Sequence, residues 1–458
     1  MNRLSISVFF FGLTVLSRAE EVPPLVPIED YTGSFAARSR MTGDWGGART
    51  SLAEHGFQLE LNNTTIYSAI VDGGKNSDSE FGGNLELVLR LDSKQLGLWP
   101  GGMLFLRAER YYDENINGDT GALFPANGVA LFPEPNDNDL ALSHLQITQF
   151  LSPHFGISLG KMDTSTGDVN EFAHGRADTK FLNAAFAFNL VTAVTMPYAP
   201  LGAAIVILPT GDPETMLSIS AVDTDGTAME SGFDTAFDGG TSFAGEFRLK
   251  TDFFGQRGHQ LVGVTWSNDE FINLGDAFDI SLPRLLGRGR NGRNTEYDSP
   301  AEEFAARTRA IIRKGLMIKR YINQIDRENS SWSAYYNFDQ YVHAEADDPT
   351  QGFGLFGRIG FADDDTNPIA SFFSLGIGGK GIIPGRDNDR FGIGWYYMDT
   401  SSELPGDLGL GHEQGVEIFY NVAVTPWLQI TPDIQIINPA VEKNDTTVVL
   451  GIRGHVRF

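Results

Sequence analysis

Two short stretches of the chain carry residue types that could do chemistry. The sequence GISLG at 156–160 fits the GxSxG pattern of serine hydrolases, in which Ser158 would attack an acyl carbonyl. The sequence GIGGKG at 376–381 has the GxGxxG spacing that holds a dinucleotide pyrophosphate at a helix N-terminus. Both motifs require a helix directly after a strand, and both lie in alternating stretches with no helical pattern after them. The spacing therefore favours neither a hydrolase nor a dinucleotide enzyme.

The sequence has no pattern typical of a metal or redox centre. It contains no cysteine, and its eight histidines show no HExxH spacing. The acidic triplet at 363–365 is typical of a hydrated loop, with weak calcium binding or bridging to lipopolysaccharide as the alternative. We therefore expect no cofactor, no metal and no enzymatic activity. An outer-membrane hydrolase built on Ser158 is the alternative from another class.

The N-terminus predicts export. Arg3 precedes an apolar run over 4–16 and the small-x-small pattern SRA at 17–19, which is typical of a signal peptide over 1–19. The run is too short for a membrane-spanning helix, and a buried N-terminal helix is the alternative. Removing Arg3 and Arg18 takes the formal net charge from −25 to −27. This acidity argues against nucleic acid as a partner.

The elements that must position any functional side chain are strands. In NLELVLRLD at 84–92, leucines alternate with Glu86 and Arg90, and many stretches of about ten residues alternate in the same way. A soluble lectin-like β protein also alternates, so it remains an alternative. The sixteen predicted strands are 57–68, 82–92, 102–112, 142–151, 155–163, 201–209, 216–223, 242–252, 259–267, 331–343, 352–362, 371–379, 389–399, 414–424, 427–437 and 446–458.

The connections between these strands alternate in length. Short connections, such as 152–154 and 425–426, alternate with long ones; the long ones are 113–141, 164–200, 224–241, 268–330 and 400–413. Outer-membrane barrels have this asymmetry, with short periplasmic turns and long extracellular loops. The sequence therefore predicts an all-β fold, a sixteen-stranded antiparallel transmembrane β-barrel with long extracellular loops. Its apolar faces would contact lipid and its polar faces a water-filled lumen.

Five motifs are similar to the carbohydrate-selective outer-membrane porin family (the OprB family). They are RSRMTGDWGGARTSLAEHGFQLEL at 38–61, LGKMDT at 159–164, NEFAHG at 170–175, FLNAA at 181–185 and WSAYYNFDQYV at 332–342. The resemblance implies a monomeric barrel in the outer membrane of a Gram-negative-type bacterium, through which small carbohydrates diffuse passively. It implies loops folded into the lumen. A general or anion-biased diffusion porin on the same barrel is the alternative.

The predicted domain organisation follows from these observations. A signal peptide over 1–19 precedes an N-terminal periplasmic segment over 20–56 and a barrel over 57–458. The connection at 268–330 is a basic insertion: between Arg284 and Arg327 it holds eleven of the chain's 34 Lys and Arg, against five acids. Its apolar periodicity predicts an amphipathic helix. This helix would either enter the channel mouth and attract anions, or lie against lipopolysaccharide or in solvent.

Selective passage of sugars needs fixed hydrogen-bond donors and acceptors, together with aromatic faces. The strand MLFLRAERYY at 103–112 offers both, since Arg107 and Glu109 share the polar parity. Charges that merely pair across strands, or that pin the loop at 164–200 to the wall, are the alternative; Asp168 and Arg176 belong to that region. The candidate constriction residues are Arg49, Glu86, Arg90, Arg107, Glu109, Lys161, Asp163, Glu171 and His174.

The last predicted strand, TTVVLGIRGHVRF at 446–458, closes the barrel against the first. Its apolar parity would face lipid, and Arg453, His455 and Arg457 would face the lumen. Phe458 resembles the assembly signal of outer-membrane barrels, which implies recognition by the barrel assembly machinery. The expected partners are thus small carbohydrates, outer-membrane lipid and lipopolysaccharide, and that machinery.

Overall fold

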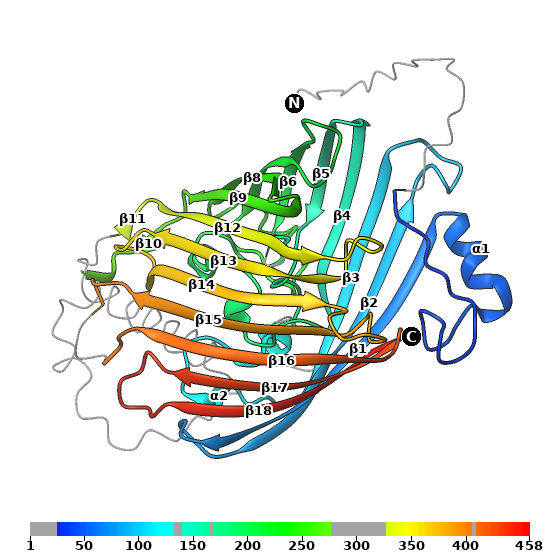
Figure 1. The fold of residues 1–458 in the computed structure, drawn as a ribbon. Helices are drawn as coiled ribbons and strands as arrows, with labels where there is room; N and C mark the ends of the chain where they lie inside the picture. The colour runs from blue at the N-terminus through cyan, green and yellow to red at the C-terminus, as the bar shows by residue number, and fades with distance from the viewer. Residues whose placement is uncertain (1–24, 132–139, 165–167, 276–326, 405–408) are drawn as a thin grey trace, which may run out of the picture.

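Sixteen antiparallel strands close into a barrel in the computed structural model (Figure 1). The structure describes residues 25–131, 140–164, 168–275, 327–404 and 409–458. The predicted signal peptide and nearly all of the predicted basic helix lie outside these residues. The barrel strands are β1 (Phe57–Asp72), β2 (Ser79–Asp92), β3 (Gly102–Asp113), β4 (Ala141–Ser152), β5 (Phe155–Lys161), β6 (Leu201–Ile207), β7 (Met216–Asp223), β8 (Thr241–Phe253), β9 (Gln256–Ser267), β12 (Ser331–Ala344), β13 (Gly352–Ala362), β14 (Ile369–Lys380), β15 (Arg390–Thr400), β16 (Glu413–Thr425), β17 (Leu428–Asn438) and β18 (Thr447–Arg457).

The sixteen predicted strands are confirmed, with ends that differ by a few residues. Each strand pairs with its neighbours in the chain, and β9 pairs with β12 across the long insertion. The strand β18 pairs with β1, which closes the barrel and leaves no free edge. A small additional sheet, β10 (Phe271–Ile272) with β11 (Arg327–Glu328), joins the two ends of that insertion and had no sequence signal.

The connection lengths confirm the predicted alternation. At the end of the barrel where β1 begins, the turns include the very short 153–154, 254–255 and 426–427. At the opposite end, the connections include 114–140, 162–200 and 268–330. No helix in the described ranges is long and apolar enough to cross a membrane.

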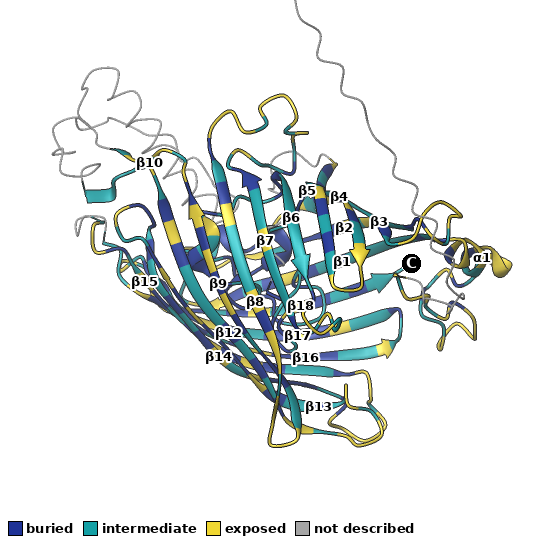
Figure 2. Cartoon of the chain, turned by 90° about the horizontal axis from the view of Figure 1, so that it is seen from above, coloured by how far each residue is buried: buried dark blue, intermediate teal, exposed yellow. Residues whose placement is uncertain are grey.

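The two faces of the barrel wall differ in the way that the alternation predicts (Figure 2). On β18, the apolar Leu450 and Ile452 are 44% and 51% exposed, whereas the neighbouring Arg453 is 1% exposed. Exposed leucine, isoleucine, valine and aromatic side chains recur on the outer face of most strands. An outer surface of this kind is stable in hydrocarbon, where every backbone polar group must be paired within the barrel.

The lumen is partly filled by the connection between β5 and β6, called here the inward loop (162–200). It contains two short helices, η3 (Ala184–Phe186) and η4 (Leu190–Ala193). Its aromatic side chains pack against inward-facing rings of the wall; Phe181, for example, lies 4.9 Å from Phe419 and 5.3 Å from Phe356 between ring centroids. The loop and one side of the wall therefore share a hydrophobic core inside the barrel.

Glycines of the wall make room for this core. A Cβ on Gly378 would lie 2.7 Å from Phe172 Cβ, and a Cβ on Gly394 would lie 2.6 Å from Phe186 Cε1. Such distances are too short for carbon atoms, so these two strand positions accept only glycine while the loop is docked. Gly378 belongs to the GxGxxG stretch, whose spacing thus has a packing explanation within a strand and needs no nucleotide.

A second connection, between β3 and β4, also packs against the inward loop: the amide of Gly128 donates to Leu182 O at 2.7 Å, and Val129 and Ala130 pack with Ala177 and Leu182. The connection between β3 and β4 holds α2 (Asn117–Thr120) and η2 (Gly128–Leu131). Before the first strand, η1 (Trp45–Gly47) and α1 (Ala48–Glu54) form a compact segment beside the barrel end that carries the C-terminus (Figure 1).

Candidate functional site

A cavity of about 660 Å³ remains in the lumen between the inward loop and the wall. Seven of its lining residues are Lys or Arg, against three acids, although the whole chain has a formal net charge of −25. The charged lining residues are Glu60, Glu86, Arg90, Arg107, Arg176, Asp178, Lys180, Lys380, Arg390 and Arg457. The cavity is thus a locally basic region of an acidic protein.

The wall formed by β1, β2 and β3 presents a ladder of paired charges. Arg90 forms an ion pair with Glu60, and Arg107 Nε lies 2.7 Å from Glu86 Oε1. Arg107 also donates from Nη1 to Asp163 Oδ2 at 2.7 Å. The ring of Phe105 lies beneath both guanidinium groups, 5.2 Å from Arg90 Cζ and 5.3 Å from Arg107 Cζ. These contacts hold the donors and acceptors of this wall in fixed positions.

Arg176 links the inward loop to this wall. Its Nη2 donates to both oxygens of Glu109, at 2.5 and 2.7 Å, and its Nη1 donates to Asp163 at 2.8 Å. Glu109 is fully buried and also accepts from Asn84 at 2.9 Å. Since a buried carboxylate is stable only when it is paired, the loop and the wall depend on each other here.

On the side of the cavity opposite β1–β3, the lining cations are Lys380, Arg390 and Lys180. Lys380 on β14 and Arg390 on β15 are register partners and share the inward parity of their strands. Nearby on the inward loop, Lys180 donates to the carbonyl oxygen of Glu171 at 2.7 Å. Burial, and then the charge of Arg390, lowers the pKa of Lys180 to about 8. Burial, followed by the positive charge of Lys180, also brings the pKa of His174 well below its ordinary value.

Four of the nine candidate residues line the cavity: Glu86, Arg90, Arg107 and His174. Asp163 and Glu109 lie directly behind them, because their oxygens are bonded to the guanidinium groups of Arg107 and Arg176. Strand parity therefore predicted correctly that Glu86, Arg90 and Arg107 face the lumen, where they line one side of the cavity. Parity also placed His455 and Arg457 correctly, since both line the cavity. Arg453 points inward too, but it donates to backbone carbonyls of the inward loop, 2.6 Å from Ala177 O.

Arg49 lies away from the cavity. It is 4% exposed and donates from Nη2 to Leu59 O at 3.0 Å and to Phe458 O at 2.8 Å. The rings of Tyr31 and Trp45 lie on its guanidinium, at 4.9 and 4.7 Å. The structure therefore shows Arg49 as a contact between the N-terminal segment and the closing strands.

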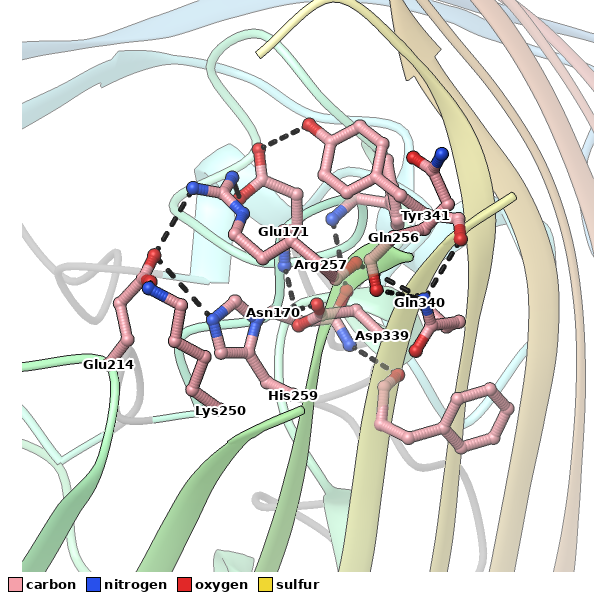
Figure 3. A network of polar contacts seen from close by, with 12 residues as sticks. Asn170, Glu171, Glu214, Lys250, Gln256, Arg257, His259, Asp339, Gln340 and Tyr341 are labelled. Atoms are coloured by element: carbon pink, nitrogen blue, oxygen red, sulfur yellow. Dashed lines mark hydrogen bonds and ion pairs between the residues drawn. The ribbon is translucent and has the colours of Figure 1, made fainter. Parts of the chain in front are cut away.

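Lys161 and Glu171 also lie outside the cavity lining. Lys161 donates to backbone carbonyls of another connection, including Thr227 O at 2.5 Å. Glu171 belongs to a polar network at the other side of the inward loop (Figure 3), where Arg257 donates to it at 3.0 Å and Tyr341 at 3.2 Å. Both residues fix loops to the wall, which was the alternative for charges of this region.

The same network pins the backbone of the inward loop. Asn170 donates to Phe338 O at 2.9 Å, and the amide of Glu171 donates to Asp339 at 3.1 Å (Figure 3). Asp168 forms a buried ion pair with Arg358 on β13, 3.0 Å from its Nη2. On β16, Glu417 accepts from the amides of two further loop residues. The loop is therefore held by both polar and apolar contacts.

The charged lining residues that sequence reasoning missed are Glu60, Asp178, Lys180, Lys380 and Arg390. Glu60 lies within the predicted strand 57–68, Arg390 lies near the start of the predicted strand 389–399, and Lys380 lies one position beyond the predicted strand 371–379. Their parity was available as a signal, but their distance along the chain from the other wall hid their common position. Lys180 and Asp178 lie on the loop, where no strand periodicity applies. The cavity lining holds no aromatic residue among those described, contrary to expectation; Phe105 supports it from behind.

The GxSxG motif lies within a strand and, among the residues that the structure describes, is not directly followed by a helix. Ser158 lies within β5, where its Oγ is 2.8 Å from Thr148 Oγ1, and the chain continues from β5 into the inward loop. In the described part of the chain, no group of three or more His, Asp and Glu could hold a metal ion.

Comparison with known proteins gives consistent results. The sequence profile of the family described as "Carbohydrate-selective porin, OprB family" matches residues 78–458. Porin B of Pseudomonas aeruginosa is 20% identical over 451 residues, which cover 92% of each chain. A high-pH structure of Pseudomonas putida OprB has a TM-score of 0.75 and 18% identity, covering 93% of this chain and 100% of that one. Its low-pH structure has a TM-score of 0.54 and 15% identity, covering 92% and 99%.

Proposed function

Because the chain belongs to the carbohydrate-selective porins of the OprB family, we propose that its basic cavity is the constriction through which sugars pass. The protein is an outer-membrane porin for the diffusion of small carbohydrates. Passage through the cavity is passive and includes no catalytic step. The single observation that carries the assignment of the site is the ladder of paired charges on β1, β2 and β3, which faces the cavity of about 660 Å³.

The ladder suits neutral, hydroxyl-rich ligands. A sugar hydroxyl is both a donor and an acceptor, so it binds well where guanidinium and carboxylate groups stand side by side. Glu86 and Arg107 provide such a pair, and Asn421 and Gln429 add amide groups on another part of the lining. Because each charge already has a partner, the pair can hold a sugar weakly without holding it so long that flux stops.

We infer that the barrel crosses the outer membrane with the end where β1 begins on the periplasmic side. We assign residues 20–56 and the short turns to the periplasmic side, the long connections to the outside, and the apolar outer face to lipid. We propose that the barrel functions as a monomer. Its C-terminal strand, ending in Phe458, is assigned as the contact for the barrel assembly machinery.

Liposome swelling tests the function of the site. Purified protein should admit mono- and disaccharides faster than amino acids of the same size, and Arg107→Gln should change the rate for glucose by at least threefold. Lys250→Gln is the matched control, because Lys250 is exposed and lies outside the cavity lining. Equal rates for solutes of equal size would contradict sugar preference, and an unchanged rate in Arg107→Gln would contradict the role of the ladder.

A further inference from the structure

The cations of the cavity fall into two groups with different partners. On the β1–β3 side and at the C-terminal strand, Arg90, Arg107, Arg176 and Arg457 each form an ion pair with a carboxylate. On the opposite side, neither Lys380 nor Arg390 forms a side-chain hydrogen bond or an ion pair with any described residue, and both line the cavity. The positive charge of the passage is therefore balanced on one side and unbalanced on the other.

Neighbouring acids do not balance this second group. Asp389, next to Arg390 in the chain, accepts instead from Arg386 at 2.7 Å and from Tyr420 at 2.7 Å. Asp348 experiences the charge of Lys380, but it accepts its hydrogen bonds from Thr350 and Gln351.

Lys180 adds a third cation to this side. It lines the main cavity and also a small side pocket that it shares with Lys380, Arg390 and Glu171. The carboxylate of Glu171 accepts its hydrogen bonds from Arg257 and Tyr341. The ammonium group of Lys180 donates to the carbonyl of Glu171 at 2.7 Å and to that of Asn170 at 3.4 Å, and it lies 3.5 Å from His174 Nδ1, so its hydrogen-bond partners are neutral groups. Burial and then the charge of Arg390 lower the pKa of Lys180, while the carboxylates of Glu171, Asp178 and Asp339 raise it by a smaller amount.

This arrangement is unfavourable without an anion. Lys380 and Arg390 are directly opposite one another on adjacent strands, where Cβ atoms are about 5 Å apart and like charges destabilise the sheet. A carboxylate or phosphate between them would convert repulsion into charge-assisted hydrogen bonds. Asn388, Asn421 and Gln429 line the same cavity and offer amide groups to hydroxyls.

We propose that Lys180, Lys380 and Arg390 form a subsite for the anionic group of an acidic sugar, either a carboxylate or a phosphate. The inference rests on the proposed function of the cavity as a sugar passage and adds a substrate class to it. The anionic group binds the unbalanced cations while the ring hydroxyls contact the amides and the paired ladder. The channel accordingly admits sugar acids and sugar phosphates as well as neutral sugars.

The experiment measures block of the chloride current through single channels in planar bilayers. Potassium glucuronate and glucose 6-phosphate are the probes, and glucose is the neutral reference. In the unsubstituted protein, at least one acidic sugar should block saturably at a concentration at least tenfold below that of glucose. In Lys380→Gln/Arg390→Gln, the half-blocking concentration of that sugar should rise at least tenfold, while glucose block changes less than twofold.

The matched control is Lys250→Gln/Lys443→Gln, which removes the same charge from exposed positions outside the cavity lining. Each sugar should block this control variant at the same half-blocking concentration as the unsubstituted protein. Preferential block by glucuronate identifies a carboxylate as the ligand, and preferential block by glucose 6-phosphate a phosphate. If neither acidic sugar blocks more strongly than glucose, or if block survives in the Lys380→Gln/Arg390→Gln variant, the subsite is refuted.

Two further results distinguish a failure of the anionic subsite from a failure of the proposed sugar-porin function. A variant that loses chloride preference but keeps the acidic-sugar block would mean that the cations only produce a diffuse positive potential, which also refutes the subsite. If glucose fails to enter liposomes through the unsubstituted protein, the proposed function itself is wrong. Heat-modifiable migration of each variant verifies that its barrel has folded.

Discussion

The lysine and arginine side chains of the cavity differ in their partners and in their burial. These differences decide which side chain changes its charge between pH 7 and 9. Arg107 is fixed between two carboxylates, and a guanidinium keeps its charge at any ordinary pH. Lys180 is buried near another cation, so its charge is the one that changes near neutrality. Its neighbour His174, with its pKa well below the ordinary value, stays neutral in that range.

The permeability ratio of chloride to potassium should fall as pH rises from 7 to 9. Lys180, with a pKa of about 8, is protonated below this value and neutral above it, so the cavity loses one positive charge. Burial raises the pKa of Asp178, but His455 and Arg453 bring it below its ordinary value, so Asp178 keeps its charge in this range. One unit charge at ~5–8 Å in a water-like medium changes the permeability of each ion about two- to fourfold, in opposite directions for chloride and potassium, so the ratio changes roughly four- to sixteenfold.

Reversal potentials in a salt gradient measure this ratio. Lys180→Met should give a ratio that is already low at pH 7 and does not change with pH. The same pH dependence in Lys180→Met as in the unsubstituted protein would show that another group titrates.

At the scale of elements, the channel is narrow because the inward loop docks against β13–β16. Aromatic side chains of the loop fill spaces that wall glycines leave open, and a buried ion pair between Asp168 and Arg358 fixes its start. Docking therefore depends on shape as well as charge, since a side chain at a wall glycine would occupy the place of a loop ring.

Gly394→Leu should displace the loop and widen the channel. The new side chain would overlap Phe186, whose Cε1 lies 2.6 Å from the position of the added Cβ. Single-channel conductance should rise severalfold, and trisaccharides should enter liposomes. Gly454→Leu is the control, because no atom lies within 4 Å of its added Cβ. A folded Gly394→Leu barrel with unchanged conductance would mean that the loop does not limit the passage.

At the scale of the whole molecule, the barrel depends on a seam between its first and last strands. The strands β1 and β18 pair over most of their length, and Arg49 joins them to the N-terminal segment by donating to Leu59 and Phe458. The ring of Trp427 packs against Phe35 at 4.7 Å between centroids, and its Nε1 donates to Phe35 O. The N-terminal segment thus covers the seam at one end of the barrel.

Arg49→Leu should weaken the seam and leave transport unchanged. Two charge-assisted hydrogen bonds and the contacts with two rings are lost, which together contribute roughly 2–4 kcal/mol to the free energy of unfolding. Urea-dependent unfolding in detergent, followed by tryptophan fluorescence, measures this loss. Altered glucose swelling with unchanged stability would instead place Arg49 in the sugar pathway.

The sequence by itself determined the barrel and the direction of its side chains. Alternation with a period of two specifies which residues face lipid and which face water, and the lengths of connections specify the asymmetry of the two ends. For this reason the strands, the paired wall at Glu86, Arg90 and Arg107, and the lumenal direction of Arg457 could all be derived from local patterns.

Only the tertiary structure decided which lumenal residues meet. The closure of the barrel brings Lys380 and Arg390 opposite a wall that lies nearly 300 positions away in the chain, and the docked loop decides which side chains stay accessible. Strand parity favoured Glu109, and its place on the inward loop favoured Glu171, yet Arg176 and Arg257 engage these two acids in loop contacts. Parity reports the face of a strand, whereas access to the channel depends on contacts between segments that are distant in sequence.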